Sequence, residues 1–139
     1  MQITIVYWSG TGNTAAMAEL IKEGAKDAGA EVKLLSVADA DDSVLDADVL
    51  ALGCPSMGAE VLEESEFEPF VCSIEGKLSG KKLALFGSYG WGDGEWMRNF
   101  DERVQNAGAS LAAESLIVND APSGDEEQRC KAFGKAIAE

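Results

Sequence analysis

One short loop, Trp8–Thr14, constrains most strongly what this chain can fold into. It follows an apolar run at Ile3–Tyr7, which is rich in β-branched and aromatic residues and too short for a helix, so the run predicts a strand. A helical pattern follows, with one face made by Met17, Leu20, Ile21, Gly24 and Ala28. The loop itself supplies glycines, hydroxyls and an amide but no charged side chain. Because backbone N–H groups at a helix N-terminus bind anions, the loop is predicted to cradle a phosphate.

The charge of the chain narrows the classes of partner and of chemistry. Its 139 residues include 25 acidic and 11 basic side chains and no histidine, which gives a net charge of −14. Such a surface repels nucleic acids and anionic membranes and favours basic partners. Without histidine, Ser-His-Asp and Cys-His catalysis and most transition-metal sites are excluded, and no metal is expected. The loop at 9–14 would therefore hold a phosphate by neutral donors alone.

Length and composition predict a single domain, 1–139, around one hydrophobic core, because 46% of the residues are hydrophobic. No apolar stretch is as long as a transmembrane helix, and the N-terminus lacks the pattern of a signal peptide. The chain has three cysteines and no CxxC pair, which favours reduced thiols over a disulfide framework. We therefore expect a cytoplasmic monomer in which all three thiols are buried, namely Cys54, Cys72 and Cys130.

Predicted strands alternate with predicted helices along the chain. After the first strand, the others are expected at 31–37, 47–53, 83–88 and 110–118, the last with room for a bend. After the first helix, amphipathic patterns predict helices at 67–78, 97–108 and 126–138. This alternation predicts an α/β fold with a parallel sheet. Right-handed crossovers would place four loops on one sheet edge, where ligands bind, at 9–14, 54–65, 89–94 and 119–124.

Several phosphate-binding families are excluded by single residues. A P-loop needs a lysine where Asn13 stands. The dinucleotide fingerprint is met only in part, by Gly10, Gly12 and Ala15, and a chain of this length leaves no second domain for a substrate. Small tyrosine phosphatases place an arginine shortly after a loop cysteine, which Cys54 lacks. A receiver domain would need acidic residues at the end of its first strand.

Two later loops suit a flat aromatic ligand. Met57 brings a polarisable thioether, and Trp91 brings a large π-face between glycines. Each of these residues could instead pack at the rim of a loop or over a helix end. Trp8 and Trp96 are interpreted as packing residues.

Three motifs in order resemble the flavodoxin family, in particular the short-chain flavodoxins of anaerobic bacteria. They are Ile5–Thr14, Leu52–Gly58 and Phe86–Gly92, and the likeness extends over the whole chain. The resemblance implies a flavodoxin-like three-layer α/β sandwich with a five-stranded parallel sheet in the order 2-1-3-4-5. It also implies non-covalently bound FMN and one-electron transfer without a substrate, which is the role of an electron carrier and not of an enzyme.

The resemblance implies a role for each loop. The FMN phosphate would bind to Ser9, Gly10, Thr11, Gly12, Asn13 and Thr14. Met57 and Trp91 would sandwich the isoalloxazine, and Glu60 would accept a hydrogen bond from the flavin N3–H. The remaining cofactor-binding residues would be Ser56, Gly58, Ala59, Ser88, Tyr89, Gly90, Gly92, Asn119 and Asp120.

The turn at Met57–Glu60 would act as the family's redox switch. A carbonyl at Gly58 would turn toward the protonated flavin N5, in a turn that needs a positive φ, which glycine supplies at little cost. Ala59 departs from the Gly, Asp or Asn often found there in the family. The acidic surroundings would destabilise the anionic hydroquinone. We therefore expect a low-potential carrier that shuttles FMN between semiquinone and hydroquinone.

Acidic residues beside the expected flavin edge predict docking of redox partners with basic surfaces, such as reductases or oxidoreductases. They are Glu60, Glu63, Glu64, Glu66 and Glu68, with Asp93, Glu95 and Asp120 nearby. Two alternatives remain at this point. One is an FMN-binding accessory or regulatory protein, and the other is a small FMN-dependent quinone reductase, although such enzymes usually carry longer loops.

Overall fold

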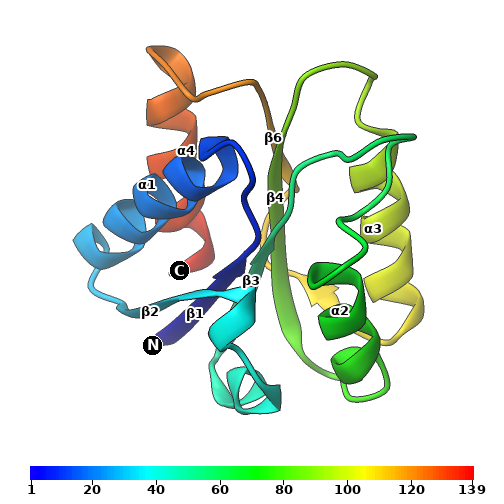
Figure 1. Ribbon diagram of the computed structural model, residues 1–139. Coiled ribbons are helices and arrows are strands. Elements are labelled where there is room, and N and C mark those ends of the chain that lie inside the picture. The colour runs from blue at the N-terminus through cyan, green and yellow to red at the C-terminus, as the bar shows by residue number, and fades with distance from the viewer.

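The central strands are apolar on both faces, and this determines the layers of the molecule. Every residue of β3 (Val49–Gly53) is buried, and β4 (Lys82–Tyr89), its parallel neighbour, is buried from Leu83 to Ser88. A parallel strand of this kind needs cover on both sides. The computed structural model, which describes residues 1–139, supplies it as a three-layer α/β sandwich (Figure 1).

The sheet is parallel throughout and has the order β2-β1-β3-β4-β5, as expected. The edge strand on one side is β2 (Glu31–Ser36), and β1 (Gln2–Tyr7) lies between β2 and β3. Two short 3-10 helices, η1 (Val37–Asp39) and η2 (Asp42–Asp46), lead from β2 into β3. The flavodoxin-like topology is thereby confirmed.

The expected fifth strand is interrupted. It consists of β5 (Ser110–Leu111) and β6 (Leu116–Asn119), which pair with the same side of β4. Leu111 lies opposite Leu83 and Leu116 opposite Phe86, so the outer strand uses more residues than β4 over this stretch. The residues between β5 and β6 interrupt the strand, and such irregularities are common at a sheet edge.

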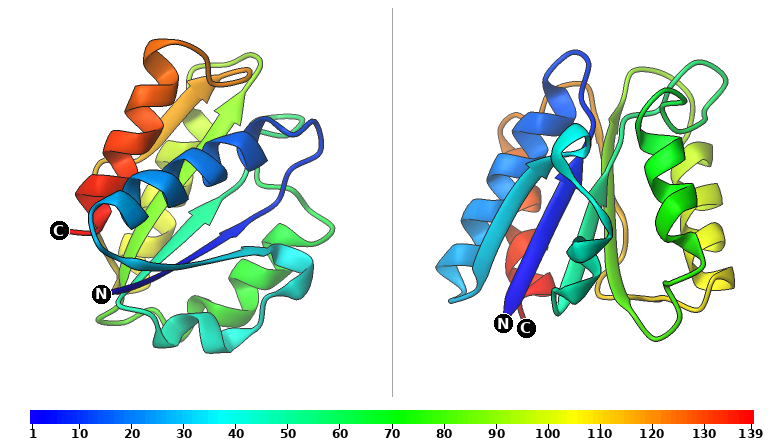
Figure 2. Two further views of the ribbon diagram at one scale, coloured as in Figure 1. Left: turned by 90° about the vertical axis from the view of Figure 1, so that its left-hand side faces the viewer. Right: turned by 60° about the horizontal axis from the view of Figure 1, so that its bottom comes forward.

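Two helices cover each face of the sheet (Figure 2). One face carries α1 (Asn13–Asp27) and α4 (Asp125–Ile137), and the other carries α2 (Phe67–Glu75) and α3 (Glu95–Asn106). A hydrophobic core lies beneath each pair. None of the helices is both long enough and apolar enough to cross a membrane.

An ion-pair cluster joins α2 to α3. The guanidinium of Arg103 donates to both carboxylate oxygens of Glu68 at 2.7 Å and also to Glu75 at 2.9 Å. The bonds from Arg103 outweigh desolvation and lower the pKa of Glu68. The thiol of Cys72 also contacts this cluster, through hydrogen bonds with Glu68 and Arg103.

One expectation about burial was wrong. Cys72 is exposed, because it lies on the outer side of α2, whereas Cys54 and Cys130 are buried. Burial raises the pKa of Cys54 to about 12 and that of Cys130 to about 11.

Helices α1 and α4 cross with their backbones in contact. A Cβ atom at Gly24 would overlap the carbonyl oxygen of Lys131, and one at Gly134 would overlap the carbonyl oxygen of Ile21. Only glycine permits this approach. The orientation of α1, and with it the loop that begins the helix, therefore depends on this pair of glycines.

Alanine at Gly24 or Gly134 should destabilise the protein, although alanine favours helices intrinsically. Separating the helices should cost about 1–3 kcal/mol, which exceeds the gain of about 0.5–1 kcal/mol from helix propensity. Urea denaturation would measure the change in the free energy of unfolding. Gly76→Ala is the matched control, because Gly76 has open space around it and a helical φ of −72°. Equal stability of the Gly24→Ala and Gly76→Ala variants would contradict the close crossing.

Candidate functional site

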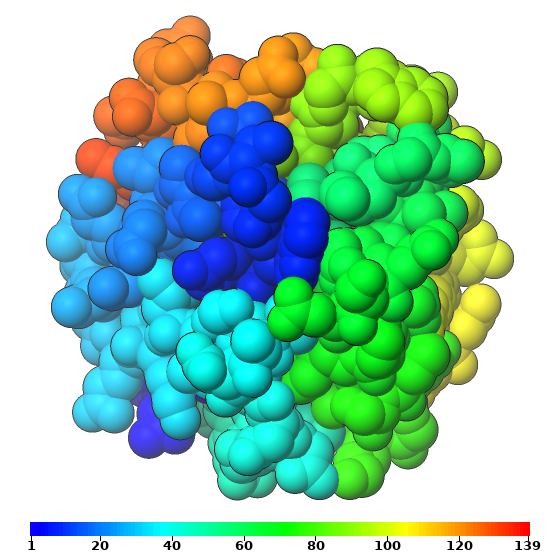
Figure 3. Space-filling view, in the orientation of Figure 1, coloured from blue at the N-terminus to red at the C-terminus, as the bar shows by residue number.

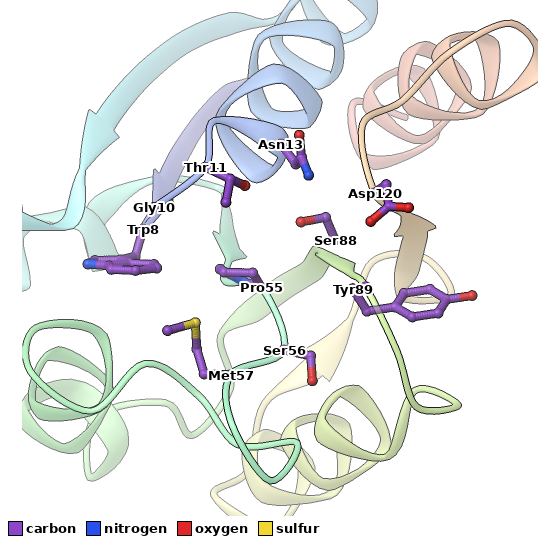
Figure 4. A pocket seen from close by; sticks show the side chains of 11 residues that line it. Trp8, Gly10, Thr11, Asn13, Pro55, Ser56, Met57, Ser88, Tyr89 and Asp120 are labelled. Atoms are coloured by element: carbon purple, nitrogen blue, oxygen red, sulfur yellow. The ribbon is translucent and has the colours of Figure 1, made fainter.

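Four loops meet at the carboxyl edge of the sheet and enclose a cavity of about 240 Å³ (Figure 4). They are the loops that follow β1, β3, β4 and β6, as the pattern of the sequence predicts. The residues that line the cavity are Trp8, Gly10, Thr11, Asn13, Pro55, Ser56, Met57, Ser88, Tyr89, Gly90 and Asp120. Asp120 is the only charged side chain among them.

The first loop is shaped by the hydroxyl of Ser9. Its Oγ accepts hydrogen bonds from the backbone N–H groups of Gly12, at 3.1 Å, and Ala15, at 3.3 Å. A hydroxyl has two acceptor positions and one proton, so the proton of Ser9 is left to donate. Gly12 has a φ of 97° and precedes the first residue of α1. The loop thus combines a helix N-terminus with a hydroxyl donor, and both favour an anion.

A buried pair of hydroxyl groups connects two of the loops. Thr14 Oγ1 lies 3.0 Å from Ser88 Oγ, and the N–H of Ser88 donates to Thr14 Oγ1 at 3.4 Å. The carbonyl of Ser88 accepts from the N–H of Ser56 at 3.0 Å. Ser88 therefore connects the loops after β1 and β3 to the end of β4.

The turn after Met57 is closed by two backbone hydrogen bonds with Val61, of 2.9 and 3.0 Å. Within it Gly58 has a φ of 47° and Glu60 a φ of 56°. The left-handed region costs a non-glycine residue about 1–2 kcal/mol, so this conformation of Glu60 is strained. Its Oε1 is buried without a hydrogen-bond partner and lies where a Cβ of Gly92 would be. The unpaired carboxylate oxygen of Glu60 therefore faces the loop after β4.

Trp8 and Pro55 are cavity residues that sequence reasoning missed. Trp8 was expected to be a packing residue, but its ring lines the cavity while its Nε1 donates to Glu66 Oε1 at 3.2 Å. Both residues directly adjoin predicted site residues within the motifs, and that adjacency was the available signal. Trp96 is buried as expected, and its Nε1 donates to the carbonyl of Cys54 at 3.1 Å.

Half of the predicted site residues do not line this cavity. They belong to the same four loops or adjoin them, and Trp91 stands at the surface with 64% of its area exposed. Thr14 is buried beneath the first loop. The nine that do not line it are Ser9, Gly12, Thr14, Gly58, Ala59, Glu60, Trp91, Gly92 and Asn119. Ligand contact remains a prediction at all of the predicted site residues, those that line the cavity included.

The acidic cluster is only partly available to a partner, which corrects the expectation. Glu63 is buried, because its carboxylate accepts from the N–H groups of Ser65, Glu66 and Phe67 at 2.7–2.8 Å and caps α2. Desolvation alone would raise the pKa of Glu63, but these hydrogen bonds lower it. Glu68 is held by Arg103. The exposed acidic side chains near the cavity are Glu64, Glu66, Asp93, Glu95 and Asp120.

Comparison with known proteins gives a consistent result. The family model described as flavodoxin matches residues 5–133. A flavodoxin from Clostridium beijerinckii is 56% identical over 96% of this chain and 97% of its own length. A flavodoxin from Megasphaera elsdenii is 49% identical over 98% of both chains. The solution structure of two-electron reduced Megasphaera elsdenii flavodoxin superposes with a TM-score of 0.89 and 47% identity, over 98% of both chains.

The family match covers nearly the whole chain, and the relatives match over nearly their whole lengths. Their shared fold, with its loops at the carboxyl edge of a 2-1-3-4-5 sheet, is the fold described above. This chain belongs to the flavodoxin family, whose members bind FMN and transfer electrons between redox partners without acting as enzymes.

Proposed function

We propose that the four-loop cavity binds FMN and that residues 1–139 act as one domain, a low-potential one-electron carrier. The observation that carries the proposal is the distribution of charge in the cavity. Its phosphate loop is neutral, most of its walls are uncharged, and the single charged side chain that lines it is the carboxylate of Asp120. Such a cavity accepts a neutral ring more readily than an anionic one.

The residues present fit FMN. Neutral donors at the start of α1 suit its phosphate, and the indole of Trp8, the thioether of Met57 and the rim residue Trp91 suit a flat ring. The buried and unpartnered oxygen of Glu60 suits the imide N–H of the ring. When bound, FMN supplies a group that takes up electrons one at a time.

The chain's own residues would shift the potentials of the two reduction steps in opposite directions. The turn at Gly58 can present a backbone carbonyl to a newly protonated ring nitrogen, which favours the first step. Asp120 and the exposed acidic residues disfavour negative charge on the ring, which makes the second step harder. Repulsion between close charges near a surface amounts to a few kcal/mol at most and is screened by salt.

Redox partners with basic surfaces fit the exposed carboxylates Glu64, Glu66 and Glu95, which lie in or next to the loops that follow β3 and β4. Action as a cytoplasmic monomer is part of the proposal and agrees with the three free thiols. A quinone reductase or a regulatory protein is not favoured, because the relatives that match end to end are flavodoxins.

The proposal predicts that purified apoprotein takes up one FMN and quenches its fluorescence. A reductive titration should then resolve two separate one-electron steps, the second at a much lower potential than the first. Visible absorption during the titration measures both. A single two-electron step, or steady turnover of a quinone with a hydride donor, would contradict the carrier function.

Gly58→Ala should lower the potential of the first step and leave FMN bound. Alanine costs about 1–2 kcal/mol in the left-handed conformation that Gly58 has here, with a φ of 47°, and the proposal assigns this conformation to the turn that presents its carbonyl to the reduced ring. Gly76→Ala is the control, because Gly76 is remote from the cavity and has a negative φ. An unchanged first potential in Gly58→Ala would contradict the role of the turn.

Neutralising acidic residues at the cavity should raise the potential of the second step. The test variant carries Glu64→Gln, Glu95→Gln and Asp120→Asn together. The control carries the same change in charge at the opposite edge of the sheet, through Asp27→Asn, Asp46→Asn and Glu139→Gln, all of which are exposed. Because the control residues lie outside the four loops of the cavity and salt screens distant charges most strongly, a rise of equal size in both variants would contradict local repulsion.

A further inference from the structure

One wall of the cavity depends on a hydrogen bond made outside the cavity. The ring of Trp8 lines the cavity on the side of Met57, away from Ser88 and Asp120 (Figure 4). The indole Nε1 of Trp8 points the other way and donates to Glu66 Oε1 at 3.2 Å, between residues 58 positions apart in the sequence. This is the one side-chain hydrogen bond between residues 8–14 and residues 54–66.

The other end of the Trp8 ring rests against the phosphate loop. A Cβ atom at Gly10 would lie 3.0 Å from the ring, which is closer than carbon atoms normally approach. The backbone of Trp8 is held by a hydrogen bond of 3.0 Å from its N–H to the carbonyl of Gly53. With the backbone fixed, the ring can move only by rotation of its side chain, and the bond to Glu66 opposes that rotation.

Glu66 has a backbone held by hydrogen bonds and a side chain exposed to solvent. Its own N–H donates to Glu63 Oε1 at 2.8 Å, and its carbonyl accepts from the N–H of Phe70 at 3.2 Å, so its backbone is fixed at the start of α2. The side chain of Glu66 is exposed. On this face the N-terminal segment, in blue, lies against the part of the chain around α2, in green (Figure 3). A hydrogen bond at the surface can exchange with water, so it opens more readily than one in the core.

We propose that Trp8 and Glu66 form a latch that closes the cavity between the phosphate loop and α2 and limits the release of bound FMN. Trp8 is a positioning residue in this inference, which rests on the proposed function. Breaking the latch removes a hydrogen bond to a charged group, which typically stabilises by an amount equivalent to about tenfold in an equilibrium constant or more. FMN enters and leaves through the open latch, and the latch is closed in the free protein, so breaking it should accelerate association and release together.

The test measures FMN association and release by stopped-flow fluorescence in the full-length protein. Trp8→Phe keeps an aromatic ring but removes the donor, and Glu66→Ala removes the acceptor. Each should release FMN about tenfold faster, and association should accelerate by a similar factor, so that the dissociation constant changes little. The double variant should release FMN no faster than either single variant, because the same bond is lost in all three.

Two controls separate the latch from charge and packing. Glu64→Ala removes a neighbouring exposed carboxylate that makes no hydrogen bond, so its release rate should match the wild type. Glu66→Gln keeps an acceptor oxygen, so its release rate should return close to the wild-type value. Multiplying effects in the double variant, or a Glu64→Ala variant as fast as Glu66→Ala, would overturn the latch.

The outcomes also distinguish the latch from the proposed function. If the wild type binds FMN tightly and the Trp8→Phe variant releases it at the same rate, only the latch is overturned. If the wild type does not bind FMN at all, the proposed function fails and the latch fails with it. The indole N–H signal of Trp8 in NMR spectra of the apoprotein gives a readout without the cofactor. Its exchange with water should be faster in Glu66→Ala than in Glu66→Gln, and equal rates would contradict the hydrogen bond.

Discussion

The site depends on one residue near the carboxyl end of β4, Ser88. Its side chain bonds to Thr14 at the start of α1, and its carbonyl accepts from the N–H of Ser56 in the loop after β3. The next residue, Tyr89, accepts through its carbonyl from the N–H of Asp120 in the loop after β6. Four loops from distant parts of the chain are thus fixed to one strand end. This gathering at the carboxyl edge is the rule for open parallel sheets, for which flavodoxins themselves are a known example.

The acidic side chains of this protein have two separate roles, one in the structure and one near the cavity. Many acidic side chains support the structure: Glu63 caps α2, and Glu68 and Glu75 hold Arg103 across to α3. Asp120 is the one acidic side chain that lines the cavity, and the phosphate loop is neutral. A cation in that loop would strengthen phosphate binding, but it would also ease formation of an anionic ring. A neutral loop instead leaves the negative surroundings uncompensated.

Strain is concentrated where the proposed chemistry needs movement. Glu60 and Asp120 are the only residues other than glycine with a positive φ, and both belong to loops of the site. Backbone strain of this kind persists when surrounding contacts enforce it, and it is common at functional sites. In contrast, the crossing of α1 and α4 at Gly24 and Gly134 is rigid. The site therefore joins an adjustable turn to a firmly held helix start.

The sequence by itself determined the fold class, the strand order by resemblance, and the loops that form the site. These follow from local patterns: apolar runs for strands, helical periodicity, and a glycine-rich loop between a strand and a helix. Only the tertiary structure decided which side chains meet. The bulge before Leu116, the capping by Glu63, the exposure of Cys72 and the bond from Trp8 to Glu66 all join or separate segments far apart in the chain. No local pattern records such a contact, because it depends on how the packed helices bring distant backbones together.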